Sequence, residues 1–195
     1  MAIDRAFFET PTLELCIKLL GKELTLHGVG GYIVEVEAYM GPHDRAAHSY
    51  GGRRTPRTEV MYGPPGRAYV YMIHRQHCLN VVSGPEGVPE AILVRALQPT
   101  KGIEIMQQRR GRTDGLTDGP GKLCQALGIT REHNGWDFLT SPLRISDGIP
   151  VEEVAVGTRI GIDNAGEARF YPWRFWIAGN PYVSRPRKPL YTIRL

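Results

Sequence analysis

Short runs rich in β-branched and aromatic residues recur along this chain, and few helical segments lie between them. We expect strands at residues 31–39, 68–73, 79–83, 91–97, 158–162 and 173–177. Parallel strands need long crossover connections, usually helices, and too few such segments are present. The pattern therefore predicts one mixed α/β domain over residues 1–195, with a curved, largely antiparallel sheet and a few short helices.

Three short helices and one long loop region are expected beside this sheet. Thr10 can cap the first helix, Pro11 suits its first turn, and Gly21 can end it. The other two helices are expected at about 100–110 and at 122–127. Residues 40–67 read as a long loop, and loops of that length in a compact domain are usually functional or disordered.

The composition excludes several classes of protein. Hydrophobic residues make up 42% of the chain and charged residues 23%, which disfavours disordered and fibrous proteins. The longest stretch without Asp, Glu, Lys or Arg is residues 24–34, far short of a membrane span, and the N-terminus lacks the pattern of a signal peptide. The three cysteines lie far apart and form no CxxC motif, so we expect a cytoplasmic location without a disulfide framework or a metal site.

The net charge of +4 conceals regions of opposite sign. Residues 45–100 carry 7 basic and 3 acidic side chains, and residues 168–195 carry 6 basic and no acidic ones. Clustered arginine suits bidentate contact with phosphates, so one interpretation is a nucleic-acid partner. The other interpretation is an ordinary solvated surface. No nucleotide-binding or GxSxG motif is present, and no cofactor is expected.

The most unusual local feature is the pair Glu35 and Glu37 in the strand at 31–39. Strict alternation places residues 32, 34, 36 and 38 on one face, and both carboxylates on the other, about 7 Å apart. Such a pair can supply a general acid and base, as in a carbohydrate-active enzyme, or can lie on the wet side of an edge strand. Arg95, inside the apolar run at 91–97, needs either a buried ion-pair partner or a ligand.

Three further features permit both a structural and a functional interpretation. His48 lies in the long loop, where a histidine usually makes surface contacts or hydrogen bonds. Tyr69 and Tyr71 occupy alternate positions of a strand and so share one face. They can be core residues, or they can form a wall on which a base stacks. Lys122 follows a Gly-Pro-Gly turn at a helix start, where backbone N–H groups can bind phosphate.

Taken together, these segments resemble the alkyladenine (3-methyladenine) DNA glycosylases of the mammalian-enzyme type. The resemblance covers nearly the whole chain, with many motifs in the same order, and suits a compact bacterial member. The matching segments are residues 33–39, 41–42, 44, 47–49, 54–57, 61, 65–66, 69–71, 78–82, 94–97, 119–129, 159–161 and 172–175.

The resemblance implies a monofunctional glycosylase that flips a damaged purine out of duplex DNA and hydrolyses its N-glycosidic bond, initiating base excision repair. Family substrates include 3-methyladenine, 7-methylguanine, hypoxanthine and ethenoadenine. By the family pattern Glu37 activates the attacking water, Arg95 helps to hold it, and Glu35 is a structural partner. We also expect a monomer without metal or cofactor, acting on double-stranded DNA in the cytoplasm, at the nucleoid if bacterial.

The resemblance also assigns residues around the base and along the DNA. The expected pocket residues are Tyr39, His48 and Tyr71, with Asn80 disfavouring normal guanine through its 2-amino group. The residues that match positions at or near the DNA are Arg53, Thr55, Arg57, Met61 and Lys122. We add His74, Arg75 and Gln76, at the tip of a hairpin that can fill space and hold phosphates.

One departure from the family pattern concerns the hairpin after the Tyr-Val-Tyr strand. The family usually has a tyrosine there that enters the minor groove, whereas this chain is one residue shorter and has His74 as the nearest match. An apolar or aromatic wedge normally offsets the cost of unstacking. We therefore expect weaker capture of the flipped base with the chemistry retained. The alternative is a catalytically weak protein that binds damaged DNA, while the basic regions disfavour a glycan substrate.

Overall fold

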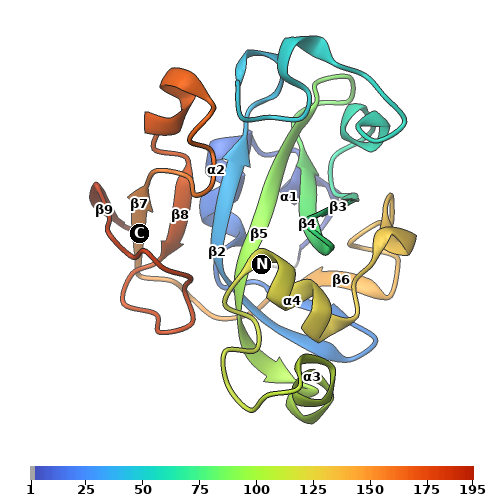
Figure 1. Cartoon of the computed structure of the whole chain (residues 1–195), viewed down its shortest axis with the longest axis vertical. Helices are drawn as coiled ribbons and strands as arrows, with labels where there is room; N and C mark the ends of the chain where they lie inside the picture. The colour runs from blue at the N-terminus through green and yellow to red at the C-terminus, as the bar shows by residue number, and fades with distance from the viewer. Residues whose placement is uncertain (1–2) are drawn as a thin grey trace.

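The computed structural model describes residues 3–195 and has a mixed α/β fold. Its strands form one open sheet, and every strand pair in it is antiparallel, which confirms the predicted fold class (Figure 1). The order is β3-β4-β5-β2-β8-β7-β9, with β1 paired to β2 and to β6. The strands are β1 Glu23–Leu26, β2 Val29–Tyr39, β3 Ala68–Ile73, β4 Gln76–Ser83, β5 Glu90–Lys101, β6 Leu143–Ser146, β7 Glu153–Gly157, β8 Arg174–Ile177 and β9 Tyr191–Arg194.

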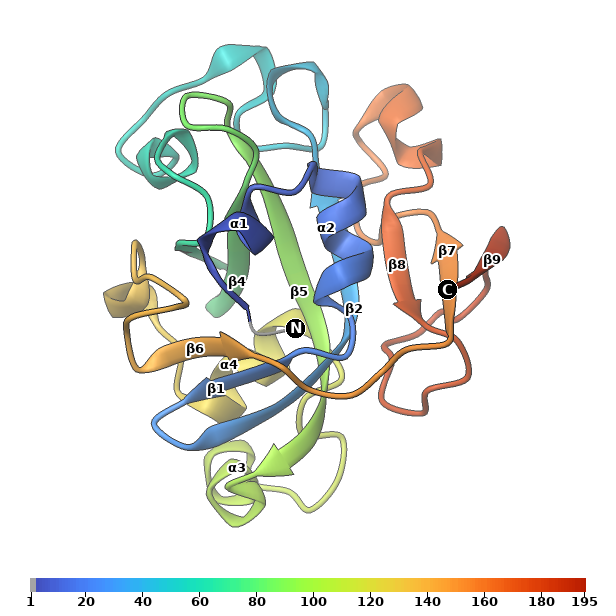
Figure 2. The ribbon, with the colours of Figure 1, turned by 180° about the vertical axis from the view of Figure 1, so that it is seen from behind.

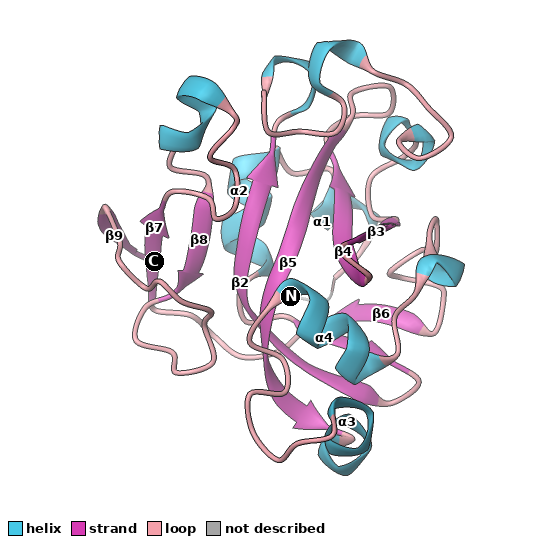
Figure 3. Cartoon of the chain, viewed as in Figure 1, coloured by secondary structure: helices cyan, strands magenta, loops and turns pink. Residues whose placement is uncertain are grey.

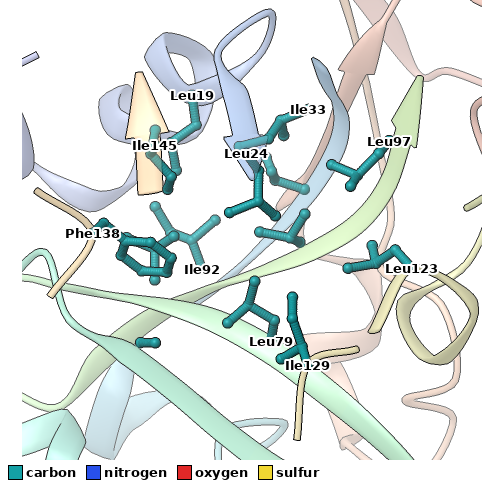
Figure 4. Packing of buried hydrophobic residues seen from close by; sticks show 14 of the residues in the cluster. Leu19, Leu24, Ile33, Leu79, Ile92, Leu97, Leu123, Ile129, Phe138 and Ile145 are labelled. Carbon is teal, nitrogen blue, oxygen red and sulfur yellow. The ribbon is translucent and has the colours of Figure 1, made fainter. Parts of the chain in front are cut away.

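Four short α-helices pack against this sheet. They are α1 Arg5–Phe8, α2 Thr12–Leu19, α3 Ile103–Arg110 and α4 Pro120–Leu127. In the view from behind, α1 and α2 cover the central strands (Figure 2). Figure 4 shows Leu19 of α2, Leu123 of α4 and Ile145 of β6 converging with residues of the central strands in one core. No helix in the described part of the chain combines the length and the apolar character that a membrane crossing requires.

The pairing between the two longest strands, β2 and β5, is irregular at the level of the glutamates. The register skips Val34 on β2 and Arg95 on β5, so each strand carries one extra residue there. A bulge of this kind redirects side chains. As a result Ile33 and Val36 both join the main core, while Val34 packs against Trp176 in a second cluster. The predicted strict alternation along this strand is therefore wrong at Val34.

Loops and single turns of 3-10 helix gather at one end of the sheet, the upper end in Figure 3. The loop region predicted at 40–67 lies there and contains η1 Gly41–His43, η2 Tyr50–Gly52 and η3 Glu59–Tyr62. A further turn, η5 Gly166–Phe170, precedes β8 at the same end (Figure 3), and η4 Arg131–His133 follows α4. This end of the sheet carries the pocket described below.

Some predicted elements were displaced or missing. The strand predicted at 158–162 is wrong, because the strand ends at Gly157 and residues 158–162 form a loop. Thr10 does not cap the first helix: Pro11 occupies the N-cap position and no side chain bonds there. Sequence reasoning also missed α1, β1, β6 and β9, which have four residues each. Four residues are too few to show a clear period.

Candidate active site

Glu37 lies near the end of β2, at the centre of the sheet, where β2 pairs with β5 on one side and β8 on the other. Its side chain is fully buried. Oε2 accepts a hydrogen bond from the backbone N–H of Ile160 at 2.7 Å, and Oε1 accepts one from the Tyr39 hydroxyl at 3.1 Å. The Arg95 guanidinium donates to the same Oε1 at 3.4 Å. The interpretation of an edge strand facing water is therefore wrong.

Burial raises the pKa of the Glu37 carboxyl above its usual range. The Arg95 charge and the Ile160 N–H act in the opposite direction and favour the ionised form. A carboxylate whose pKa is moved toward neutrality is a better proton acceptor than a solvent-exposed glutamate. Glu37 is thus equipped to act as a general base.

Glu35 has a different environment, although it also lies on β2 and is fully buried. Its Oε1 accepts from Arg95 Nε at 2.7 Å and from Arg174 Nε at 3.1 Å. The Ser184 hydroxyl donates to the same Oε1, and the Ser184 backbone N–H donates to Glu35 Oε2. With its oxygens occupied by structural donors, Glu35 is an ion-pair partner. Arg95 joins the two carboxylates, so it has the buried ion-pair partners that one of the two interpretations required.

A pocket opens beside Glu37 at the loop end of the sheet. Its lining residues are Tyr39, His48, Met61, Tyr69, Tyr71, Asn80 and Ala91. The ring centroids of His48 and Tyr71 lie 4.5 Å apart at an interplanar angle of 71°. Because the Tyr39 ring lines the pocket while its hydroxyl bonds Glu37, the carboxylate lies directly behind an aromatic wall. Such a pocket suits a flat, π-rich group.

His48 is held in the neutral form by its surroundings. Burial lowers the pKa of His48 to about 4, and the nearby charges of Arg57 and Arg53 act in the same direction. Its Nδ1 lies 2.9 Å from the Tyr69 hydroxyl, which fixes the ring in the pocket wall. At neutral pH the wall therefore carries no positive charge at this position.

We expect this depressed pKa to be visible by NMR and to respond to Arg57. In the folded wild-type protein the His48 ring resonances should titrate near pH 4, well below the 6.5 of an exposed histidine. Arg57→Gln removes a nearby cation and should raise that pKa, whereas Arg112→Gln, far along the chain, should not. Because the folded-state pKa is the lower one, the contribution of His48 to stability should be lost as the pH falls from about 6.5 to 4. A wild-type titration near 6.5 would contradict this account.

Comparison with known proteins identifies the family to which this chain belongs. Residues 6–181 match the family model described as methylpurine-DNA glycosylase. The chain belongs to the methylpurine-DNA glycosylase family. It is accordingly a DNA glycosylase, a hydrolase of N-glycosyl bonds, and its substrate is DNA with alkylated bases.

Several relatives share about half of their residues with this glycosylase. A protein of Oceanobacillus iheyensis is 52% identical over 189 residues, which is 94% of this chain and 96% of the relative. One of Bacillus licheniformis is 52% identical over 185 residues, which is 92% of this chain and 94% of the relative. One of Bacillus subtilis (strain 168) is 51% identical over 92% of this chain and 94% of its own length. All three carry the name "Putative 3-methyladenine DNA glycosylase".

The structure brings the four expected pocket residues of the glycosylase together, and adds others. Tyr39, His48, Tyr71 and Asn80 all line the pocket, and the Asn80 amide donates to the Tyr69 carbonyl at 3.1 Å. Met61, which we expected at or near the DNA, is only 2% exposed and belongs to the pocket wall. Sequence reasoning missed the Ile160 N–H, because a backbone donor has no side-chain signature.

The other residues expected at the DNA are distributed over two places on the glycosylase. Arg53 and Arg57 are exposed on the long loop, and the Arg57 guanidinium lies 5.1 Å from the Tyr71 ring centroid. Thr55 is half-buried there and its N–H donates to the Thr58 hydroxyl. A separate groove between the β3–β4 hairpin and α4 is lined by several of the expected residues, namely His74, Arg75, Gln76 and Lys122.

The hairpin itself differs from the common pattern in its turn. His74 and Arg75 form a two-residue connection, with φ values of 48° and 63°. Two successive residues with positive φ are typical of a type I′ turn, which normally prefers Asn and Gly. Ile73, just before the turn, is 44% exposed and shares a strand face with Tyr71. The tip thus presents an apolar side chain beside His74 and Arg75, which line the groove against α4.

No group of three or more His, Cys, Asp or Glu side chains that could hold a metal ion occurs among residues 3–195. The three cysteines, Cys16, Cys78 and Cys124, are buried and free.

Proposed function

We propose that residues 1–195 form a single monofunctional glycosylase domain that flips alkylated or deaminated purines out of duplex DNA and hydrolyses their N-glycosidic bond. The proposed substrates are 3-methyladenine, 7-methylguanine, hypoxanthine and ethenoadenine, and the product is an abasic site that initiates base excision repair. The enzyme acts as a monomer on nucleoid DNA in the cytoplasm. One observation carries the proposal: a buried carboxylate, Glu37, directly behind an aromatic pocket.

Glu37 supplies the chemistry of the proposed reaction. As the purine leaves C1′ of the sugar, positive charge develops on the sugar, and the Glu37 carboxylate stabilises it. The same carboxylate accepts a proton from the water that attacks C1′. Arg95, which donates to Glu37 Oε1, keeps that oxygen oriented and favours its ionised form. No step requires a second carboxylate, in keeping with the saturated contacts of Glu35.

The pocket supplies selectivity for damaged purines. An alkylated purine is electron-poor, so its packing against the aromatic wall of Tyr39, His48 and Tyr71 is favoured by the same electrostatics as a cation over a ring. Neutral His48 does not repel such a base. Asn80 lies in the same wall, where it would exclude the 2-amino group of guanine. Damaged pairs also cost less to open, which adds to the discrimination.

The test is release of hypoxanthine from a defined duplex with enzyme in excess. We expect first-order release from the hypoxanthine duplex and none from a duplex with adenine at the same position. The altered hairpin favours a second candidate, a protein that binds damaged DNA without cleaving it. That candidate predicts tight binding of the hypoxanthine duplex with no base released.

We propose that Ile73 fills the gap that the flipped base leaves in the duplex. Stopped-flow fluorescence of an ethenoadenine duplex should show that Ile73→Ala lowers the flipping equilibrium constant by about 10- to 60-fold, since the substitution removes three carbon groups and each contributes up to about 0.8 kcal/mol when fully buried. Met72 is nearly as exposed, at 39% against 44%, but points to the opposite strand face, so Met72→Ala is the matched control. Equal effects of the two changes would contradict the assignment.

The wild-type flipping equilibrium should itself be less favourable than in relatives with a tyrosine at the hairpin, because this shorter hairpin has His74 in that place, and an imidazole is a smaller and more polar wedge than a tyrosine ring. The same stopped-flow measurement compares the two proteins directly. A wild-type equilibrium as favourable as in such a relative would show that the shorter hairpin costs nothing.

Binding should be dominated by phosphate contacts. The logarithm of the DNA affinity should fall linearly and steeply with the logarithm of the salt concentration. Each Lys or Arg side chain that binds a phosphate releases counterions from the DNA, and added salt opposes that release. Arg53→Gln removes one exposed cation from the long loop and should reduce the slope by about 0.9. Arg144→Gln, on an exposed position of β6, serves as the control and should leave the slope unchanged. A slope near zero for the wild-type protein would refute this binding mode.

A further inference from the structure

A second buried ion pair, Asp44 with Arg159, lies beside the candidate active site without lining its pocket. Both side chains are completely buried. The Arg159 guanidinium meets the Asp44 carboxylate in a bidentate pair, with N–O distances of 2.6 and 2.9 Å. The same guanidinium donates to the backbone carbonyls of Ala38 and Ala168 at 3.0 and 3.2 Å. It therefore connects the end of β2, the long loop and η5.

The pair contacts both of the groups that orient Glu37 from the loop end of the sheet. The Arg159 guanidinium lies 5.0 Å from the centroid of the Tyr39 ring and 4.9 Å from that of the Trp173 ring. Tyr39 donates its hydroxyl to Glu37 Oε1. The residue that follows Arg159 is Ile160, whose N–H donates to Glu37 Oε2. One guanidinium thus fixes a donor to each oxygen of the carboxylate.

Asp44 extends this connection to the loop that carries His48. Its Oδ2 accepts from the Met40 N–H at 2.9 Å, and its Oδ1 accepts from the Ala46 N–H at 3.0 Å. These bonds shape the turn η1 between Tyr39 and His48. The pocket wall and the carboxylate are therefore positioned by the same pair.

We propose that the Asp44–Arg159 pair is the positioning element that holds Glu37 in its reactive orientation relative to the pocket. The inference rests on the proposed function, since it assigns the pair a role in the rate of base release. Neither residue touches the base or the attacking water. A planar bidentate fork that also contacts aromatic rings is a geometry that arginine provides and lysine does not.

The test uses Asp44→Asn and Arg159→Lys in the full chain, with hypoxanthine release measured under single-turnover conditions. We expect the rate constant to fall by about 10- to 100-fold in both variants, because small displacements of reacting groups have effects of that size. The dissociation constant for a duplex with an abasic-site analogue should change by less than about twofold. The control is Asp137→Asn, which weakens the ion pair between Arg5 and Asp137, whose N–O distance is 2.7 Å. Because this pair does not contact Glu37, the rate constant should stay unchanged.

A merely structural role would give a different result. Partial unfolding lowers the fraction of active enzyme, measured by titration with the substrate duplex, and leaves the single-turnover rate constant of the folded molecules unchanged. That outcome, or a wild-type rate constant for Arg159→Lys, would overturn the inference. Glu37→Gln is measured in parallel: if it retains full activity, the proposed function fails, whereas an inactive Glu37→Gln with fully active Asp44 and Arg159 variants rejects only the positioning role.

Discussion

Glu37→Gln is expected to lower the single-turnover rate of hypoxanthine release by about 10²- to 10⁴-fold, the usual contribution of a general base. The substitution preserves the size of the side chain and its acceptor toward Ile160, but the amide cannot take a proton or stabilise charge on the sugar. Binding of a duplex with an abasic-site analogue should be retained. Release of the free base, followed by chromatography, measures the rate.

The matched control for Glu37→Gln is Glu23→Gln, on the neighbouring strand β1. Glu23 pairs with Lys101 away from the pocket, so this variant should keep the wild-type rate. A rate for Glu37→Gln within twofold of the wild type would remove Glu37 from the reaction. A loss shared equally by both variants would point to a general effect on the fold.

The same role predicts the direction of the pH dependence. Glu37 must be ionised to accept a proton, so the rate should fall as the pH drops through its pKa. Because burial raises that pKa, the acid limb should lie above the 4.5 of an ordinary glutamate. The charge of Arg95 lowers the pKa of Glu37, so Arg95→Gln should raise that pKa and move the acid limb of the rate profile to still higher pH. An unchanged limb in Arg95→Gln would contradict the coupling.

Glu35→Ala is expected to have the largest effect on stability, lowering the free energy of unfolding by about 3–5 kcal/mol. The substitution leaves the guanidinium groups of Arg95 and Arg174 without their shared carboxylate in a buried region. It also removes the acceptor of the Ser184 hydroxyl and N–H. Urea unfolding followed by circular dichroism measures the change.

The control for Glu35→Ala is Glu14→Ala, which breaks the exposed pair with Lys18 on α2. Exposed pairs one helical turn apart contribute about 0.3–0.5 kcal/mol, so that variant should unfold almost like the wild type. If Glu35→Ala lowered the unfolding free energy by no more than Glu14→Ala does, Glu35 would not be the ion-pair partner that the geometry indicates.

The contrast between the two glutamates shows what the sequence can predict and what it cannot. Their strand, their shared face and the need of Arg95 for a partner follow from local pattern. Their different roles do not, because Glu35 is defined by Ser184, 149 residues away, and Glu37 by Ile160, 123 residues away. Only the family resemblance indicated the choice of Glu37 from the sequence.

Other errors of prediction have a similar physical origin. The bulges at Val34 and Arg95 depend on the pairing of two strands, so alternation within one strand could not reveal them. Asp44 and Arg159 were visible as parts of matching motifs, but their pairing across 115 residues was not. In contrast, the strand Ala68–Ile73 was predicted with its observed bounds, since it is a continuous β-rich run with turns on both sides.

The two bulges also have a consequence for how this protein can change over evolution. Ile33 and Val36, on either side of them, pair with Leu97 and Val94, so the extra residue on one strand compensates for the extra residue on the other. These two bulges occupy a short window, and the pairs from Gly31 to Ile33 and from Val36 to Tyr39 keep the same register on its two sides. A change that kept both extra residues would therefore leave the pairing on the two sides of the window aligned. A deletion of the extra residue from only one of the two strands would remove this compensation. Every residue pair on one side of the window would then shift by one.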